Sequence, residues 1–120
     1  ISMLYYKLDG TLPVSATPKE AHALLGDAEA RRVAYTEVAD GINVSTVFLC
    51  INHQFMASGP PLLFETMCFG GPYDEEMDRY STWEAAMQGN QALVERVQRA
   101  IAPTALAGAW DAEEAQQWLR

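Results

Sequence analysis

The sequence of 120 residues has few basic side chains and no long apolar run. Eight lysines and arginines stand against 16 acidic residues, which gives a formal net charge of -8. Direct binding to DNA or RNA needs a basic surface, so the charge balance excludes that class of function. A membrane helix needs about 20 consecutive apolar residues, and the N-terminus has no signal-peptide pattern. We therefore expect a cytoplasmic protein that does not associate with a membrane.

Cysteines and catalytic motifs are equally scarce. Cys50 and Cys68 are the only cysteines, and their spacing predicts neither a metal site nor a disulfide framework, so we expect buried free thiols. No His-Glu-x-x-His, phosphate-loop or Gly-x-Ser-x-Gly pattern occurs. Gly70 and Gly71 are followed by a proline and an acidic run instead of a helix, which excludes a phosphate loop there. The sequence predicts no cofactor and no metal, and it favours a function other than catalysis.

What the sequence does contain is a large apolar fraction, 49% of all residues. This composition and length predict one globular domain over residues 1–120. Ile1 and Ser2 precede Met3, and we expect the native chain to start at that methionine. Residues 1–60 carry 4 basic and 6 acidic groups, and residues 61–120 carry 4 and 10. Most of the acidity therefore belongs to the second half.

Strand-like patterns dominate the first 70 residues. A hairpin is expected around Asp9-Gly10, because both residues tolerate the positive φ angles of a tight turn. Pro13 restricts its second strand to the edge of a sheet. Three longer runs are rich in β-branched and aromatic residues, and the first of them ends at Asp40-Gly41, a second hairpin signal. The economical fold is α+β, with an antiparallel meander of three to five strands; the predicted strands are residues 4–8, 11–14, 32–38, 44–51 and 62–69.

Short helices are predicted near both ends of the chain. Thr17 and Glu20 form a capping box, with a proline at the first helical position and Gly26 as the stop. Asp111 opens a last short helix near the C-terminus.

One long helix is predicted to pack on the sheet. It begins at Ser81, which forms a capping box with Glu84, and it ends before Pro103. Gly89 lies at the edge of its apolar stripe and suits a close approach to a strand. The predicted stripe follows spacings of three and four; it contains Trp83, Met87, Asn90, Val94, Val97 and Ile101.

The strands at 44–51 and 62–69 have no clean polar face. A half-solvated antiparallel sheet alternates apolar and polar residues. Both faces of this sheet are therefore expected to need a cover, from helices, from loops or from a second copy of the chain. The pattern predicts a homo-oligomer, most simply a dimer.

Three short stretches in the middle of the chain are distinctive: Val-Ser-Thr-Val-Phe-Leu at 44–49, Leu-Phe-Glu-Thr-Met at 63–67 and Phe-Gly-Gly at 69–71. They carry a resemblance of residues 31–100 to a family of small uncharacterised phage and prophage proteins. It implies a phage or prophage origin and the cytoplasm of a bacterial host, and it implies no activity.

Glu65 is the first candidate for a functional side chain. It stands within an apolar strand, where a carboxylate needs a partner or has a raised pKa. The functional interpretation joins it to His53 and Tyr80 in an acid–base site at one end of the sheet. The structural interpretation pairs it with Arg32, Arg79 or a tyrosine, and makes His53 a hydrogen-bonded loop residue.

Two further segments are candidate binding surfaces. The acidic run after Gly71 is either a solvated loop or a surface that imitates a nucleic-acid backbone. The loop after residue 53 either presents two apolar side chains to a partner or folds back over the sheet. The residues concerned are Asp74, Glu75, Glu76, Asp78, Phe55 and Met56.

The leading interpretation is a phage-derived accessory protein that associates with itself and acts by binding, with a host protein as a further partner. One alternative is a small enzyme or small-molecule-binding protein that uses Glu65, His53 and Tyr80. Another is an acidic inhibitor that imitates nucleic acid, which requires one continuous acidic face.

Overall fold

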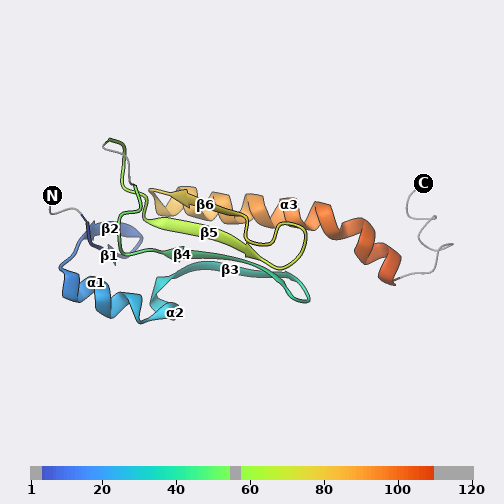
Figure 1. The fold of residues 1–120 in the computed structure, drawn as a ribbon, viewed down its shortest axis with the longest axis horizontal. Helices are drawn as coiled ribbons and strands as arrows, with labels where there is room; N and C mark the ends of the chain where they lie inside the picture. The colour runs from blue at the N-terminus through green and yellow to red at the C-terminus, as the bar shows by residue number, and fades with distance from the viewer. Residues whose placement is uncertain (1–3, 55–57, 110–120) are drawn as a thin grey trace.

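The structure is a computed structural model that describes residues 4–54 and 58–109. It has the α+β fold that the sequence predicts, with a two-stranded sheet, a four-stranded sheet, two short helices and one long helix (Figure 1). In chain order the elements are β1 (Tyr6–Asp9), β2 (Leu12–Ser15), α1 (Pro18–Leu25), α2 (Ala28–Arg31), β3 (Arg32–Ala39), β4 (Ile42–Phe48), β5 (Phe64–Phe69), β6 (Met77–Tyr80) and α3 (Trp83–Ala109).

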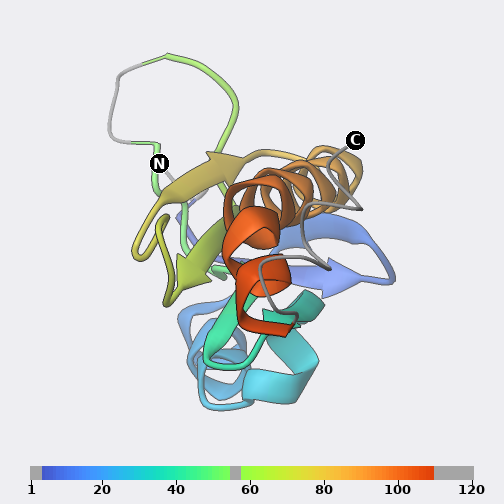
Figure 2. The ribbon, with the colours of Figure 1, turned by 90° about the vertical axis from the view of Figure 1, so that its right-hand side faces the viewer.

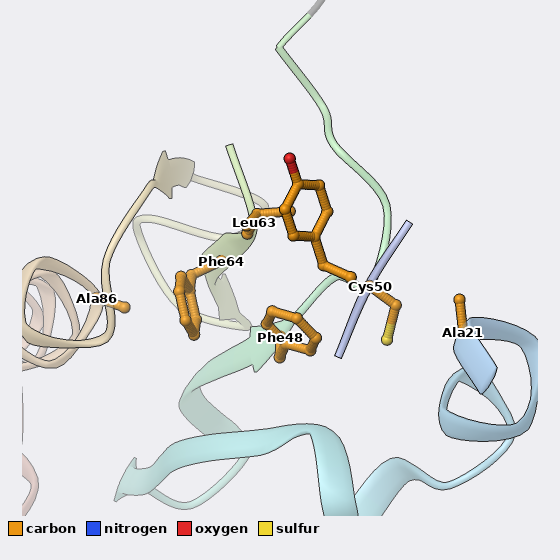
Figure 3. Packing of buried hydrophobic residues seen from close by; sticks show 7 residues of the cluster. Ala21, Phe48, Cys50, Leu63, Phe64 and Ala86 are labelled. Atoms are coloured by element: carbon orange, nitrogen blue, oxygen red, sulfur yellow. The ribbon is translucent and has the colours of Figure 1, made fainter. Parts of the chain in front are cut away.

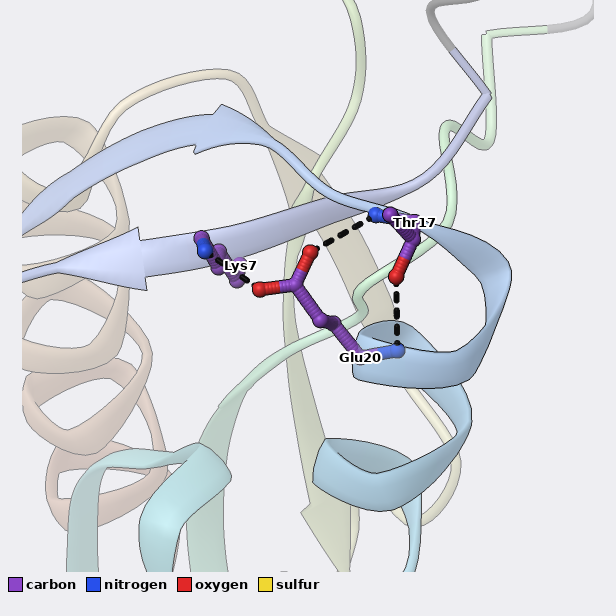
Figure 4. A network of polar contacts seen from close by, with 3 residues as sticks. All are labelled: Lys7, Thr17 and Glu20. Atoms are coloured by element: carbon purple, nitrogen blue, oxygen red, sulfur yellow. Dashed lines mark hydrogen bonds and ion pairs between the residues drawn. The ribbon is translucent and has the colours of Figure 1, made fainter.

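The N-terminal hairpin and the first helix follow the prediction. Strands β1 and β2 pair antiparallel around Gly10, whose φ of 62° is the left-handed conformation that this turn requires. The Thr17 hydroxyl accepts a hydrogen bond from the Glu20 N–H, and the Glu20 carboxylate accepts one from the Thr17 N–H (Figure 4). The same carboxylate forms an ion pair with Lys7 of β1. The capping box thus also ties α1 to the hairpin.

The main sheet is an antiparallel meander with the strand order β3-β4-β5-β6. Strands β3 and β4 are joined at the predicted Asp40-Gly41 turn, where Gly41 has a φ of 75°. Strand β4 ends at Phe48, earlier than the predicted limit at Ile51. The reason is Cys50, whose φ of 66° turns the chain out of the extended conformation. Its carbonyl instead accepts a hydrogen bond from the Tyr6 N–H, at 2.8 Å, and so joins the hairpin to the sheet.

Two elements were not predicted. Strand β6 lies where the sequence indicates an acidic loop, and it pairs with β5 over four residue pairs. Its four residues are too few to show a periodicity. The single-turn helix α2 is capped by Asp27, whose carboxylate accepts the N–H of Ala30. Arg31 at its end donates to the Phe48 carbonyl, at 2.9 Å, and thereby fixes α2 to the end of β4.

Both predicted ends of the long helix are wrong. Thr82, not Ser81, caps the helix, because its hydroxyl accepts the N–H of Ala85 at 3.1 Å. At the other end α3 continues through Pro103 to Ala109. A proline inside a helix removes one hydrogen bond, here the one to the carbonyl four residues earlier. The alanine-rich sequence on both sides favours helix strongly enough to continue past that loss. The helix predicted from Asp111 lies outside the described residues.

The face of α3 that packs on the sheet differs in part from the predicted stripe. Asn90 and Val97 are buried as predicted, whereas Met87 is 42% exposed. Ala86 and Leu93 are buried instead. The buried positions follow one another at spacings of four, three and four, so the true stripe is rotated slightly from the predicted one.

The core consists of two apolar clusters with a polar layer between them. One cluster lies at the hairpin end of the sheet (Figure 3) and contains Tyr6, Ala21, Phe48, Cys50, Leu63, Phe64 and Ala86. The other contains Val44, Cys68, Leu93 and Val97. Between them lie Thr46, Thr66 and Asn90, which are the buried polar residues of the described chain. Asn90 donates to the Thr46 hydroxyl at 2.9 Å, and that hydroxyl lies 2.6 Å from the hydroxyl of Thr66.

No helix in the described part of the chain has the length and apolar character that crossing a membrane requires.

Candidate functional site: the open face of the four-stranded sheet

The four-stranded sheet has one covered and one open face. Helix α3 lies along one side of the sheet, and no other described helix lies across the opposite side (Figure 2). Residues paired across antiparallel strands project to the same face. The register therefore assigns every second residue of β3 to β6 to the open side. The open face consists of Arg32, Tyr35, Glu37, Asn43, Ser45, Val47, Glu65, Met67, Phe69, Met77 and Arg79.

The middle of this face is a cross-strand row that is apolar on β3, β5 and β6 and has a serine on β4; it is called the apolar row below. Tyr35 pairs with Ser45, Ser45 with Met67, and Met67 with Met77. Tyr35 is 47% exposed and Met77 is 40% exposed. Phe69, which is the next residue of β5 on the same face, is 45% exposed. Large apolar side chains grouped in this way indicate an interaction surface more than single exposed residues do.

Charged side chains flank the apolar row, and their positive and negative charges are equal in number. The Arg79 Nε donates to the Glu65 carboxylate at 3.0 Å, in a directly paired cross-strand position. The Arg32 guanidinium lies 5.0 Å from the centre of the Tyr35 ring. Together with Glu37 the face carries two basic and two acidic groups. It is therefore neutral on a chain whose net charge is -8.

The predicted acid–base site is not assembled. Glu65 lies on the open face and pairs with Arg79, one of the partners that the structural interpretation named. Tyr80 pairs with Phe64 and so lies on the covered face, against α3. His53 lies in the loop after β4, and its Nδ1 is 2.8 Å from the Ile51 carbonyl oxygen. The sheet itself separates the carboxylate from the phenol.

The cysteines are free and buried, as the sequence predicts. Burial raises the pKa of the Cys50 thiol, although Arg31 acts in the opposite direction. Burial also raises the pKa of Cys68, and Asp74 and Glu76 raise it further. A reactive cysteine needs a lowered pKa and access to solvent, so neither environment suits a nucleophile.

The acidic segment is a structured turn in which most carboxylates have partners. The Asp74 carboxylate accepts the N–H of Gly70 at 2.7 Å, and Glu76 pairs with Arg96 at 2.6 Å. Asp78 accepts the N–H of Arg79, whereas Glu75 is exposed with a φ of 69°. These interactions fold the connection between β5 and β6. The described segment is therefore not one row of free charges.

The two apolar loop residues, Phe55 and Met56, lie outside the described residues. Within the described ranges no group of histidine, cysteine and acidic side chains has the arrangement of a metal site.

The sequence indicated Glu65 and its candidate partners Arg32 and Arg79, but it did not indicate the open face as a site. The face on which Tyr35 lies could not be predicted, because apolar and polar residues do not alternate along β3. Met77 and Arg79 could not be placed without β6. Phe69 was assigned to the correct strand, but the sequence does not indicate which face the long helix covers.

No protein-family model, no curated protein and no solved structure matches this chain. The resemblance of residues 31–100 to phage proteins therefore stays a prediction.

Proposed function

We propose that this protein acts by binding, as an accessory protein of a phage or prophage, and that its first partner is a second copy of itself. The open face of the four-stranded sheet is the proposed interface. The observation that carries the proposal is the row of Tyr35, Met67 and Met77 with Phe69 beside it, left without a cover among the described residues. The phage setting is supported only by the sequence resemblance.

The charge of the face supports a second copy over another partner. Two molecules with a net charge of -8 repel each other unless the contacting surfaces are neutral or complementary. The open face carries Arg32 and Arg79 against Glu37 and Glu65, whereas the other charged residues of the chain are 6 basic and 14 acidic. It is thus the face on which two copies approach with the least repulsion.

The order of the charges along the strands selects one two-fold arrangement. A two-fold axis along the apolar row reverses the strands of the second copy, so that Arg32 of each molecule faces Glu37 of the other. A two-fold axis parallel to the strands instead places β3 of one copy over β6 of the other. Arg32 of one copy then lies close to Arg79 of the other. The first arrangement pairs opposite charges and stacks the apolar row on itself, and we propose it for the dimer.

Association through the sheet edges is less favourable than association through the face. Strand β3 has register irregularities between Arg32 and Ala34 and between Glu37 and Ala39. Such bulges disrupt the regular row of free N–H and C=O groups that a second strand needs. At the other edge β6 has only four residues.

Analytical ultracentrifugation over a range of protein concentrations tests the proposal. We expect a monomer–dimer equilibrium for the natural chain. Arg32→Glu and Glu37→Arg each place like charges opposite one another, so each should weaken the dimer by about tenfold or more. The double variant restores the opposite pairing and should restore association.

Lys19→Glu is the matched control, because it changes the net charge as Arg32→Glu does but lies on the exposed surface of α1. It should leave the dimer nearly unchanged. A monomer at every concentration would refute self-association. A dimer that Arg32→Glu strengthens would refute the proposed axis and favour the one parallel to the strands.

A further inference from the structure

A cavity lies between the edge strand β6 and helix α3, two elements that lie side by side in the fold (Figure 1). Its volume is about 190 Å³. Met77 at the edge strand belongs both to the lining of this cavity and to the open face described above, whereas the other lining residues do not belong to that face. The cavity is lined by Thr66, Glu76, Met77, Asp78, Tyr80, Gly89, Ala92, Leu93 and Arg96.

Small residues on one stripe of α3 leave this space open. Gly89 and Ala92 face β6 at a spacing of three, and Arg96 follows one turn later. The ring of Tyr80 fills the room next to Gly89, since a Cβ atom at this position would lie 2.0 Å from the Tyr80 hydroxyl oxygen. Ala92, whose side chain is a single methyl group, lines the cavity next to it.

A chain of hydrogen bonds ends at the cavity. It runs from Asn90 to Thr46 and on to Thr66, both hydroxyls being buried. Because the Asn90 amide donates to Thr46, the Thr46 hydroxyl can donate to Thr66, and the Thr66 hydroxyl in turn can donate to the phenol of Tyr80, an interaction that lowers the pKa of that phenol. The hydroxyl hydrogen of Tyr80 therefore remains for another acceptor. Burial and the nearby Asp78 raise the pKa of the phenol, so at neutral pH it stays a donor.

The charges at the rim leave one carboxylate without a basic partner. Arg96 pairs with Glu76 at 2.6 Å and lies over the ring of Tyr73, 4.8 Å from its centre. Asp78 accepts only the backbone N–H of Arg79, and no basic side chain of the described residues forms an ion pair with it. The local balance at the cavity is one negative charge, close to a hydroxyl donor.

From this arrangement we infer that the cavity binds a small organic amine that also carries a hydrogen-bond acceptor. The ammonium group lies against the Asp78 carboxylate, and the acceptor receives the Tyr80 hydroxyl. A cavity of about 150 Å³ holds one benzene molecule, so this volume suits about six to eight non-hydrogen atoms. The acidic surface of the protein raises the local concentration of cations and excludes anions.

Three probes of nearly equal size test the inference: aminobutanol, its neutral counterpart butanediol, and the anion hydroxybutyrate. Each is titrated into isotopically labelled protein, and binding is followed through the backbone amide shifts of Thr66, Tyr80 and Gly89. Aminobutanol should shift these amides in a saturable way. Butanediol should bind about tenfold more weakly, because it lacks the charge that Asp78 recognises, and hydroxybutyrate should not bind.

Two variants locate the site. Asp78→Asn keeps the shape of an exposed side chain and removes its charge. It should weaken the binding of aminobutanol by about tenfold and leave the binding of butanediol unchanged. Ala92→Leu fills the cavity from the helix and should abolish both interactions. Glu95→Gln, which removes a charge on α3 outside the cavity lining, is the matched control and should bind as the natural chain does.

The inference fails if aminobutanol produces no saturable shifts at these amides, or if butanediol binds equally well. It also fails if Glu95→Gln weakens binding as much as Asp78→Asn, since the effect is then one of net charge. The Arg32→Glu variant should bind aminobutanol as the natural chain does, so the test of this site is independent of the test of the proposed dimer.

Discussion

The two faces of the four-stranded sheet are built from the same strands but differ in how their side chains are satisfied. On the covered face Val44, Phe48 and Phe64 are fully buried, and the polar Thr46 and Thr66 bond to each other. On the open face the corresponding side chains are half-buried or exposed, and Glu65 and Arg79 form an ion pair. Helix α3 determines the difference, because it removes water from one side only.

Burial changes how much a polar side chain contributes to the free energy of unfolding. A buried hydroxyl without a partner costs the full desolvation free energy, whereas an exposed ion pair contributes little. The covered face is therefore expected to set the stability of the fold, and the open face to set its interactions. Substitutions on the two faces measure this division.

The largest effect is expected from Phe64→Ala compared with Phe69→Ala. Both residues lie on β5, but Phe64 is 0% exposed and Phe69 is 45% exposed. Phe64 contacts Phe48 and Trp83, with ring centroids 5.3 and 6.3 Å apart. Removing it should lower the free energy of unfolding by about 3–5 kcal/mol.

Phe69→Ala should cost less than about 1 kcal/mol when the protein is monomeric. Urea denaturation at low protein concentration measures both variants. Equal losses would show that the open face is as much a part of the core as the covered one.

A smaller loss is expected from Thr66→Val, which replaces a buried hydroxyl by a methyl group of similar size. Thr46 then loses one of its hydrogen-bond partners and keeps Asn90. We expect a loss of about 1–2 kcal/mol in the free energy of unfolding. Adding Thr46→Val should cost less than the sum of the two single changes, and strict additivity would argue against a coupled network.

The ion pair on the open face should matter less than the buried hydroxyls. The Glu65 and Arg79 side chains retain exposures of 18% and 30%. A double-mutant cycle with Glu65→Gln and Arg79→Gln should give a coupling of about 0.5 kcal/mol. Added salt should reduce it further, and a coupling as large as that of the threonine pair would contradict the division between the faces.

The smallest effect is expected at Glu20, outside the sheet. Hydrogen bonds from Lys7 and from Thr17 lower the pKa of its carboxyl from 4.5 to about 2. Because the pKa is lower in the folded state, the stabilisation is complete above pH 4.5 and disappears as the pH falls toward about 2.

Melting temperatures measured across this pH range should fall less steeply for Glu20→Gln than for the natural chain. Glu29→Gln, on the exposed surface of α2, is the control and should keep the natural pH dependence. If both variants behave alike, the ion pair with Lys7 has no role in the pH response.

Much of the fold could be predicted because its signals are local. The Thr17–Glu20 capping box, the Gly41 turn and the β-branched run of β4 each depend on neighbouring residues only. The errors have equally physical causes. Cys50 adopts a left-handed conformation because of contacts with the N-terminal hairpin, and β6 is held by β5 more than by its own sequence.

The candidate sites were harder to predict because they depend on which side chains share a face of the sheet. The pairing of Glu65 with Arg79 was among the predicted alternatives, but the separation of Glu65 from Tyr80 needed the register of β5 and β6. The cavity next to Tyr80 depends on Gly89 and Ala92 of α3. No sequence period reveals which small residues of a helix lie opposite a gap.

The composition and local pattern by themselves determined an acidic α+β chain with an antiparallel meander, a capped short helix and a long helix. They also indicated that the sheet has no polar face. Only the tertiary structure decided which face α3 covers, since either set of alternating side chains could have been buried. That choice leaves Tyr35 and Met77 exposed on either side of the half-buried Met67, and it places Tyr80 and Asp78 beside the cavity.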